Sequence, residues 1–178
     1  MKKIAILTVF FSLMLMSCSS EPSLQKYFVE STNSNDFIAV DVSANILRLD
    51  KNNISAEENK ALDTFEKMNI LAFKNDGKNN AKFETEKTKV ATILKNPKYQ
   101  ELMKMSRGTD GGAVYFVGEN DNIDEFVLYG SNKDSGFAIV RVLGDKMNPT
   151  SIVTMLSLIQ KANLDIDQLK PLEAMVKM

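Results

Sequence analysis

Apolar residues recur along this chain at two spacings, one typical of helices and one typical of strands. Leu24, Tyr27 and Phe28 recur at the helical spacing, which predicts a short amphipathic helix. The polar residues 31–36 should end that helix, because side chains of this kind favour turns. Residues 37–42 then place a β-branched apolar residue at every second position, which predicts a strand.

Two further helices and a strand are expected between residues 55 and 95. Ser55 and Glu58 fit a capping box, in which the serine hydroxyl accepts a hydrogen bond from the Glu58 amide and the Glu58 carboxylate accepts one from the Ser55 amide. The helix that follows should bury one stripe, made of Ala61, Leu62, Phe65 and Met68. A short buried strand at residues 69–73 precedes a third helix, whose stripe contains Phe83, Val90, Ile93 and Leu94.

Two Asn-Pro pairs each predict the start of a helix. Asparagine is a good N-cap and proline is tolerated at the first helical position. The pair at residues 96–97 should open a short helix that turns three side chains inward, namely Tyr99, Leu102 and Met103. The pair at residues 148–149 should open an apolar helix, and residues 166–176 continue at helical spacing.

The clearest strand signal lies in the second half of the chain. Residues 113–117, 125–129 and 137–143 are strand-like and are separated by short connections rich in Gly, Asn and Asp, which predicts an antiparallel meander. With the earlier elements, this order predicts an α+β fold. We expect a single domain at residues 24–178, with a mixed, mostly antiparallel sheet of about five strands and helices packed on one face.

The first eighteen residues have the features of a leader. Lys2 and Lys3 precede an apolar run of about 13 residues, a usual length for a signal-peptide core and short of the roughly 20 that span a bilayer. The run ends in Leu-Met-Ser-Cys, which resembles the bacterial lipobox, with the only cysteine of the chain, Cys18. The resemblance implies a signal peptide at residues 1–17, lipidation of Cys18 and a tether at residues 18–23.

An ordinary secretory signal or an uncleaved anchor are the alternatives. No Ala-x-Ala site precedes Cys18, and the polar residues 19–21 stop the apolar run. Several acyl chains, such as palmitate, would hold the protein on a membrane far more firmly than one chain does. Ser19 in place of an aspartate resembles the sorting signal of outer-membrane cargo. We therefore expect a lipid-anchored protein of the cell envelope, at the outer membrane and facing the periplasm, with the leaflet left open.

Charge and composition argue against several classes of function. Without the two leader lysines, 20 of the 22 basic residues remain beside 23 acidic ones, a net charge of −3. The basic residues are scattered, so we expect no nucleic-acid partner. The chain has no histidine, and lipidation uses its only thiol, which excludes histidine-dependent nucleophiles, histidine-bound zinc and thiol redox chemistry. We expect no enzyme activity, no cofactor and no metal.

Four residues are candidates for ligand or partner contacts. Asp41 and Arg141 each interrupt an apolar strand pattern and could meet on one face of the sheet, where Arg141 would grip a carboxylate or phosphate. The alternative is that both face water. Tyr115 and Tyr129 lie in adjacent predicted strands and would form either an exposed patch for a protein partner or part of the core.

An acidic turn is the strongest candidate for a metal site. Its carboxylates, Glu119, Asp121, Asp124 and Glu125, could offer oxygen ligands to calcium. The spacing lacks the Gly at position six and the Glu at position twelve that an EF-hand loop requires. We therefore interpret these residues as solvated turn formers.

Several soft motifs follow one another in a recognisable order. Ile-Leu-Ala-Phe at residues 70–73 is followed by a lysine-rich helix, Tyr-Gln-Glu-Leu-Met at residues 99–103, a Gly-Gly turn at residues 111–112 and Leu-Gly-Asp-Lys-Met-Asn-Pro at residues 143–149. This arrangement, after a lipobox, resembles the bacterial envelope family catalogued as domain of unknown function 4252, typical of Bacteroidetes. The family has no assigned activity, so the resemblance implies a fold and assigns no residue a role.

Three functions remain open at this point. The first is a noncatalytic, lipid-anchored envelope protein that binds an unidentified envelope partner or assists envelope maintenance. The second is a binding module for a small apolar or lipidic ligand, which a continuous apolar pocket with one polar anchor would support. The third is an enzyme that works through two converging carboxylates.

Overall fold

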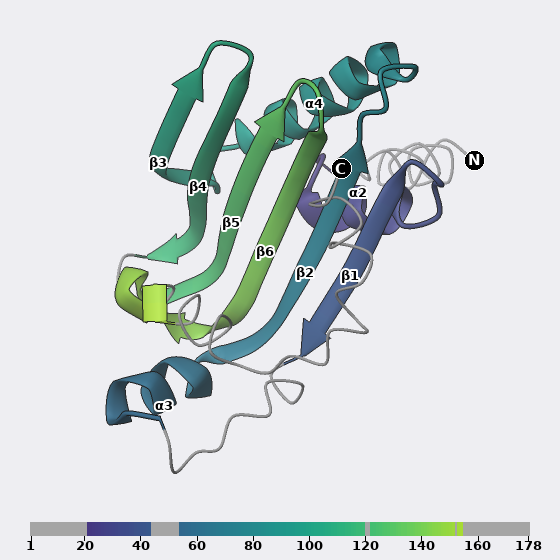
Figure 1. Cartoon of the computed structure of the whole chain (residues 1–178). Coiled ribbons are helices and arrows are strands. Elements are labelled where there is room, and N and C mark those ends of the chain that lie inside the picture. Colours follow the sequence, from purple (N-terminus) through teal and green to yellow (C-terminus); the bar gives the residue numbers. More distant parts are fainter. Residues whose placement is uncertain (1–20, 44–53, 120–121, 152, 155–178) are drawn as a thin grey trace, which may run out of the picture.

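One antiparallel sheet of six strands forms the centre of the molecule (Figure 1). The computed structural model describes residues 21–43, 54–119, 122–151 and 153–154. The strands lie in the order β1 (Phe37–Ser43), β2 (Phe65–Lys74), β6 (Gly136–Met147), β5 (Asn122–Asn132), β4 (Asp110–Glu119) and β3 (Gln100–Arg107). The predicted α+β class is confirmed, with one strand more than expected. The leader, Cys18, most of the helix expected after Asn148 and the helical segment expected at residues 166–176 lie outside the described residues.

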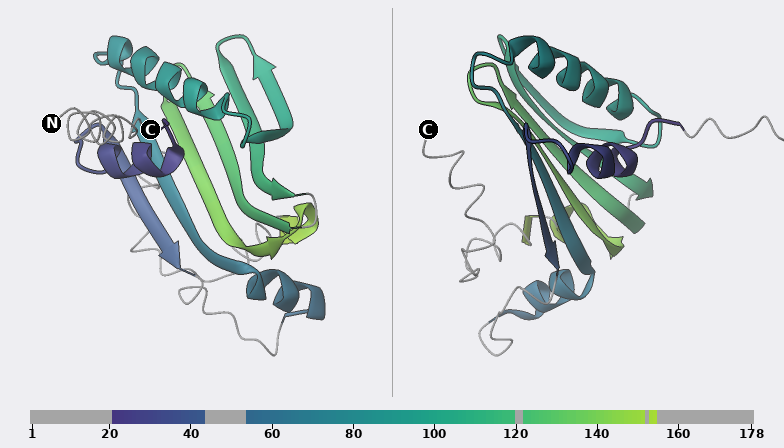
Figure 2. Two further views of the ribbon diagram at one scale, coloured as in Figure 1. Left: turned by 180° about the vertical axis from the view of Figure 1, so that it is seen from behind. Right: turned by 90° about the vertical axis from the view of Figure 1, so that its right-hand side faces the viewer.

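Two helices cover one face of this sheet. α2 (Leu24–Ser31) and α4 (Asn80–Leu94) lie on the same side of the strands when the sheet is seen edge-on (Figure 2). Their apolar stripes and the strands bury a common core, which includes Leu24, Phe28, Leu71, Phe73, Phe83, Val90, Phe137 and Ile139. Within the described part of the chain, no helix is long and apolar enough to cross a bilayer. We call this side of the sheet the helix face.

A second apolar cluster lies on the opposite face. Strand residues alternate in direction, so the neighbours of the core residues point the other way. This cluster includes Val40, Val42, Met68, Ile70, Phe126, Val142 and Met147, with Leu62 of α3 (Ala56–Asp63) packed against it. α3 lies at one end of the sheet rather than across its helix face (Figure 1).

The predicted helix starts at Ser55 and Asn148 are confirmed. Ser55 Oγ accepts a hydrogen bond from the Glu58 amide at 3.1 Å, and Glu58 Oε2 accepts one from the Ser55 amide at 2.7 Å. Asn148 Oδ1 accepts a hydrogen bond from the Ser151 amide at 2.8 Å, as an N-cap should. In both places the local sequence determines the structure.

The helix that begins at Ser55 is shorter than predicted. α3 ends at Asp63, and Phe65 and Met68 belong to β2 instead. A β-bulge shifts the register between Phe65 and Lys67, so two residues three positions apart are buried in one cluster. The bulge therefore produces the spacing that we interpreted as a helix.

The helix predicted at residues 96–103 is wrong. Asn96 supports only a turn, in which its side chain accepts a hydrogen bond from the Lys98 amide at 3.1 Å and its carbonyl accepts one from the Tyr99 amide at 3.0 Å. The chain then continues as β3, which pairs with β4 through a bulge between Glu101 and Met103. Long-range strand pairing outweighs the local helix signal here, and it adds the sixth strand.

Candidate functional site

A row of paired residues crosses the helix face of the sheet. Asp41 pairs with Asn69, Asn69 with Arg141, and Arg141 with Val127. Residues paired directly across strands point to the same face, so Asp41 and Arg141 share this face with Asn69 between them. The Asp41 carboxylate accepts a hydrogen bond from the Asn69 side chain. The structure therefore places the two candidates on one face without contact between them, Asp41 exposed and Arg141 buried.

Arg141 is held by partners inside the protein. Its side chain donates from Nε to Glu125 Oε1 at 2.6 Å and from Nη1 to Gln25 Oε1 at 2.8 Å. The guanidinium also lies 5.3 Å from the centre of the Phe28 ring, an attractive cation–π arrangement. Because Gln25 and Phe28 both belong to α2, Arg141 fixes this helix against the sheet. Only 4% of the residue is exposed, and its geometry favours a structural role over ligand binding.

A second buried polar contact joins α2 to α4. The Tyr27 hydroxyl donates to Glu86 Oε2 at 2.8 Å, and Lys89 Nζ donates to Glu86 Oε1 at 2.7 Å. Burial, followed by the contact with the Glu86 carboxylate, raises the pKa of Tyr27 far above its usual range. The sequence analysis missed Glu86, although its position between Phe83 and Val90 on the buried stripe was a usable signal.

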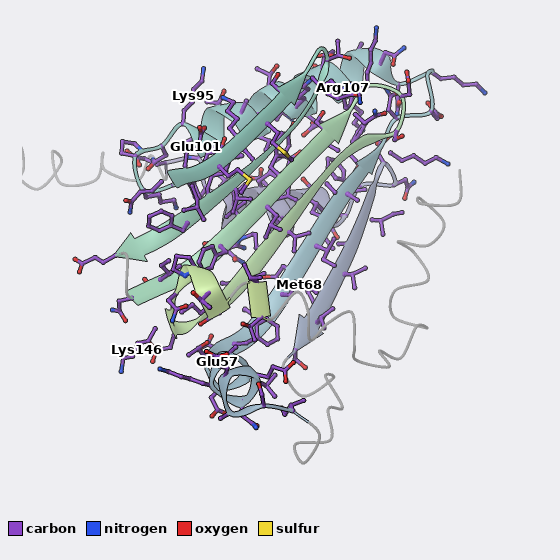
Figure 3. The ribbon with its side chains drawn as sticks, turned by 60° about the vertical axis from the view of Figure 1, so that its left-hand side comes forward. Glu57, Met68, Lys95, Glu101, Arg107 and Lys146 are labelled. Atoms are coloured by element: carbon purple, nitrogen blue, oxygen red, sulfur yellow. The ribbon has the colours of Figure 1, made fainter. Side chains whose placement is uncertain are left out.

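A cavity of about 530 Å³ lies between α4 and the helix face of β3, β4 and β5. We call it the α4–β4 cavity. Small residues leave the space, because Ala91 of α4 and Gly111 and Ala113 of β4 are among the residues that line it. Its remaining wall includes Lys87, Leu94, Lys95, Glu101, Lys104, Ser106, Tyr115, Tyr129 and Ser131. Figure 3 shows Lys95 and Glu101 at one end of β3 and Arg107 at the other.

Tyr115 and Tyr129 both line the α4–β4 cavity. Each is half-buried and packs against the core of the helix face, where the Tyr129 ring lies 6.2 Å from the Phe137 ring. Burial raises the pKa of both phenols, and the Glu101 carboxylate raises that of Tyr115 further. Both hydroxyls are therefore neutral and able to donate hydrogen bonds. The structure places the pair partly in the core and partly in a cavity wall.

Ser131 has the most unusual environment in this cavity. Its Oγ is the only buried side-chain oxygen or nitrogen among the described residues that has no hydrogen-bond partner. Ser131 lies close enough to Tyr129 to lower the pKa of that phenol, against the larger rise that burial causes, but its Oγ does not meet the geometry of a hydrogen bond. Buried polar groups are nearly always paired, so an orphan of this kind requires an explanation.

A larger and more apolar hollow of about 760 Å³ lies over β4, β5 and β6, at positions where these strands have small residues. Gly112, Gly130 and Ala138 are directly paired across these strands and turn almost no side chain toward it. Met105 of β3 borders it. Most of its lining is apolar, and its polar residues include Arg107, Asp110 and Ser131.

The strand β3 forms one edge of the sheet and is exposed along its whole length. Leu102, Met103 and Met105 are 48%, 55% and 67% exposed. Five large apolar side chains are exposed among the described residues, and three of them lie on this strand. The edge is therefore the main apolar feature of the described surface.

The acidic turn does not assemble a metal site in the described residues. Glu125 is paired with Arg141, while Asp121 lies outside the described part. Across the described ranges, no three His, Cys, Asp or Glu residues come together as metal ligands would.

Comparison with known proteins gives one match. A family model described as a domain of unknown function, DUF4252, matches residues 27–168. The matched segment contains all six strands of the sheet. No curated protein and no solved structure matches the chain.

Proposed function

The chain belongs to the DUF4252 family of domains of unknown function, and from the surface that it presents we propose that it is a noncatalytic, lipid-anchored envelope protein that binds a partner protein along β3. The partner contributes an extended segment that pairs with this edge of the sheet. A strand edge has unpaired backbone donors and acceptors, which such a segment can satisfy.

The exposed face of β3 carries this proposal. Met103 and Met105 project from the same face of the strand, on the side away from α4, because their partners Val114 and Gly112 are two positions apart on β4. Methionine side chains adapt to irregular surfaces, which suits a docking site. Added strands gain affinity from the backbone and selectivity from alternate side chains, so the partner should have apolar residues at every second position.

Two features of β3 limit which segments can pair with it. The bulge at Leu102 interrupts the regular ladder, and Glu101 and Lys104 place charges along the edge. Natural proteins use such devices to prevent indiscriminate pairing between edges. Arg107 adds a second positive charge near the β3–β4 turn. A partner segment with an acidic residue opposite Lys104 or Arg107 would complement this pattern.

The expected lipid anchor supports the same function. Attachment through Cys18 would confine the domain to the membrane surface, where the effective concentration of a neighbouring membrane protein is high. A modest interaction along one strand would then suffice. The absence of histidine from the sequence and the use of the only cysteine for lipidation leave few groups for catalysis.

A ligand-binding module is the second candidate. The α4–β4 cavity and its unpaired Ser131 hydroxyl favour it. The two functions share part of β3, because Glu101 and Lys104 belong to the cavity wall and also lie along the strand edge.

Photo-crosslinking in living cells tests the proposed function. A photoreactive residue replaces Met105 in the lipidated protein, and the matched control carries it at Thr85, an exposed position on α4. We expect one dominant crosslinked partner from position 105 only, joined through an extended segment, and its loss in a Cys18→Ala background. Equal crosslinking from both positions, or none from position 105, would contradict the proposal.

A further inference from the structure

We propose that the α4–β4 cavity binds a small amphiphilic anion, a carboxylate on an apolar chain. The first argument is Ser131, a residue of the cavity wall that is 8% exposed and whose Oγ has no hydrogen-bond partner among the described residues. A buried polar group left unpaired is destabilising, and a ligand that accepts its hydrogen bond removes that penalty. The proposal is independent of partner binding along β3.

Positive charge lies at the same end of the cavity as Ser131. Lys87 Nζ of α4 lies 3.4 Å from the carbonyl oxygen of Thr109, in the turn between β3 and β4. Thr109 is two residues from Gly111, which is the strand partner of Ser131. A carboxylate placed there would accept a hydrogen bond from Ser131 and would be attracted to the Lys87 ammonium.

The nearest acidic group does not oppose an anion directly. Asp110 also lines the cavity, but its carboxylate accepts hydrogen bonds from Asn132 Nδ2 at 2.9 Å and from the Lys133 amide at 3.2 Å. It therefore belongs to the adjacent turn. Glu101, the other carboxylate of the wall, lies 3.8 Å from Lys104.

The middle of the cavity suits an apolar chain. Ala91 and Ala113 form opposite walls, and Leu94 continues the α4 wall toward the far end. Tyr115 and Tyr129 offer ring surfaces and neutral hydroxyls, because burial raises their pKa values. The volume of about 530 Å³ is typical of sites for single small molecules.

Titration with dodecanoate tests the proposal. The protein is the complete mature chain carrying Cys18→Ser, since acyl chains on the anchor would compete, and the probe is kept below its micelle concentration. We expect amide chemical-shift changes at residues 87–95, 104–113 and 129–131. Dodecan-1-ol, which has no charge, should bind at least about tenfold more weakly, a difference of roughly 1.4 kcal/mol. Shift changes confined to other regions, or equal affinity for the alcohol, would overturn the proposal.

Two matched variants locate the site. Ala91→Phe fills the cavity from an exposed helix position and should abolish binding, while Ala81→Phe makes the same change on α4 outside the cavity and should leave binding unchanged. Ser131→Ala should weaken binding about three- to tenfold, the usual range for one hydrogen bond. Unchanged affinity in folded Ala91→Phe protein would overturn the proposal. If that variant does not fold, the shift map of the unsubstituted cavity decides the question alone.

Discussion

Gln25 and Arg141 are 116 residues apart in the chain, yet the Arg141 guanidinium donates a 2.8 Å hydrogen bond to the Gln25 side chain. The same guanidinium pairs with Glu125 from the neighbouring strand. One buried cation therefore links a helix near the start of the domain to two central strands near its end. The residue that most resembled a ligand-binding arginine in the sequence serves to assemble the fold.

Loss of this cation should destabilise the fold strongly. Arg141→Met leaves the Glu125 carboxylate buried beside apolar groups, and we expect the free energy of unfolding in urea to fall by about 3 kcal/mol or more. The double variant Arg141→Met, Glu125→Leu should recover most of that loss, because neither charge remains. Lys67→Met, an exposed change on β2, is the control and should alter the value by less than about 0.5 kcal/mol. A loss under 1 kcal/mol for Arg141→Met would contradict this role.

Tyr27 should make the unfolding free energy depend on pH in the alkaline range. Its folded-state pKa is raised above the unfolded value, so its contribution is complete below about pH 10 and is lost as the pH rises from there toward the folded-state pKa. Tyr27→Phe should cost about 1–2 kcal/mol near neutral pH. Above pH 10 the difference between the two proteins should narrow by up to about 1.4 kcal/mol per pH unit.

Urea titrations of both proteins between pH 8 and pH 11 measure this difference. Tyr115→Phe is the comparison, because the Tyr115 phenol has no hydrogen bond to a carboxylate among the described residues and should change the profile less. A constant difference between Tyr27→Phe and the unsubstituted protein across this range would show that Tyr27 does not titrate differently on folding.

Gly136 and Gly130 give a matched test of the turn between β5 and β6. Gly136 has φ of +117°, and a Cβ there would lie 1.9 Å from the Phe73 carbonyl oxygen, whereas a Cβ at Gly130 meets nothing within 4 Å. Gly136→Ala should therefore cost about 3 kcal/mol or more, and Gly130→Ala less than about 1 kcal/mol. Thermal and urea unfolding measure both. Equal costs would mean that the turn adopts another conformation.

The methionines of β3 should matter for binding and little for stability. Both side chains are mostly exposed, so the double variant Met103→Lys, Met105→Lys should change the unfolding free energy by less than about 0.5 kcal/mol. The same variant should abolish recovery of the partner captured from position 105. Val29→Lys, an exposed apolar residue on α2, is the control and should leave recovery intact. Partner recovery that survives the double variant would exclude this face of β3.

The sequence predicts the parts of this fold that depend on local chemistry. The Ser55 capping box, the strand at residues 37–42 and the three-strand meander are all present. Both wrong assignments involve a strand with a bulge, near Phe65 and near Leu102, and at Phe65 the extra residue gives buried strand residues a spacing of three. A local pattern cannot separate such a strand from a helix, since the difference lies in the partner strand.

The candidate sites show the same division. Arg141 was identifiable as an ion within an apolar pattern, but its partner Gln25 depends on how α2 crosses the sheet. Nothing in the sequence marks Ser131 as unusual. Its hydroxyl lacks a hydrogen-bond partner because its strand neighbour, Gly111, has no side chain and because a cavity separates this part of the sheet from α4. Sequence patterns can locate unusual residues, whereas the complete site requires the tertiary arrangement.

Amide hydrogen exchange with and without the captured partner is the most direct measurement of strand addition at β3. We expect slower exchange at residues 100–107 in the complex and unchanged exchange in β1, which is the other edge of the same sheet and serves as an internal control. Protection in β1 or α4 without protection in β3 would contradict strand addition at β3 as the function of this domain.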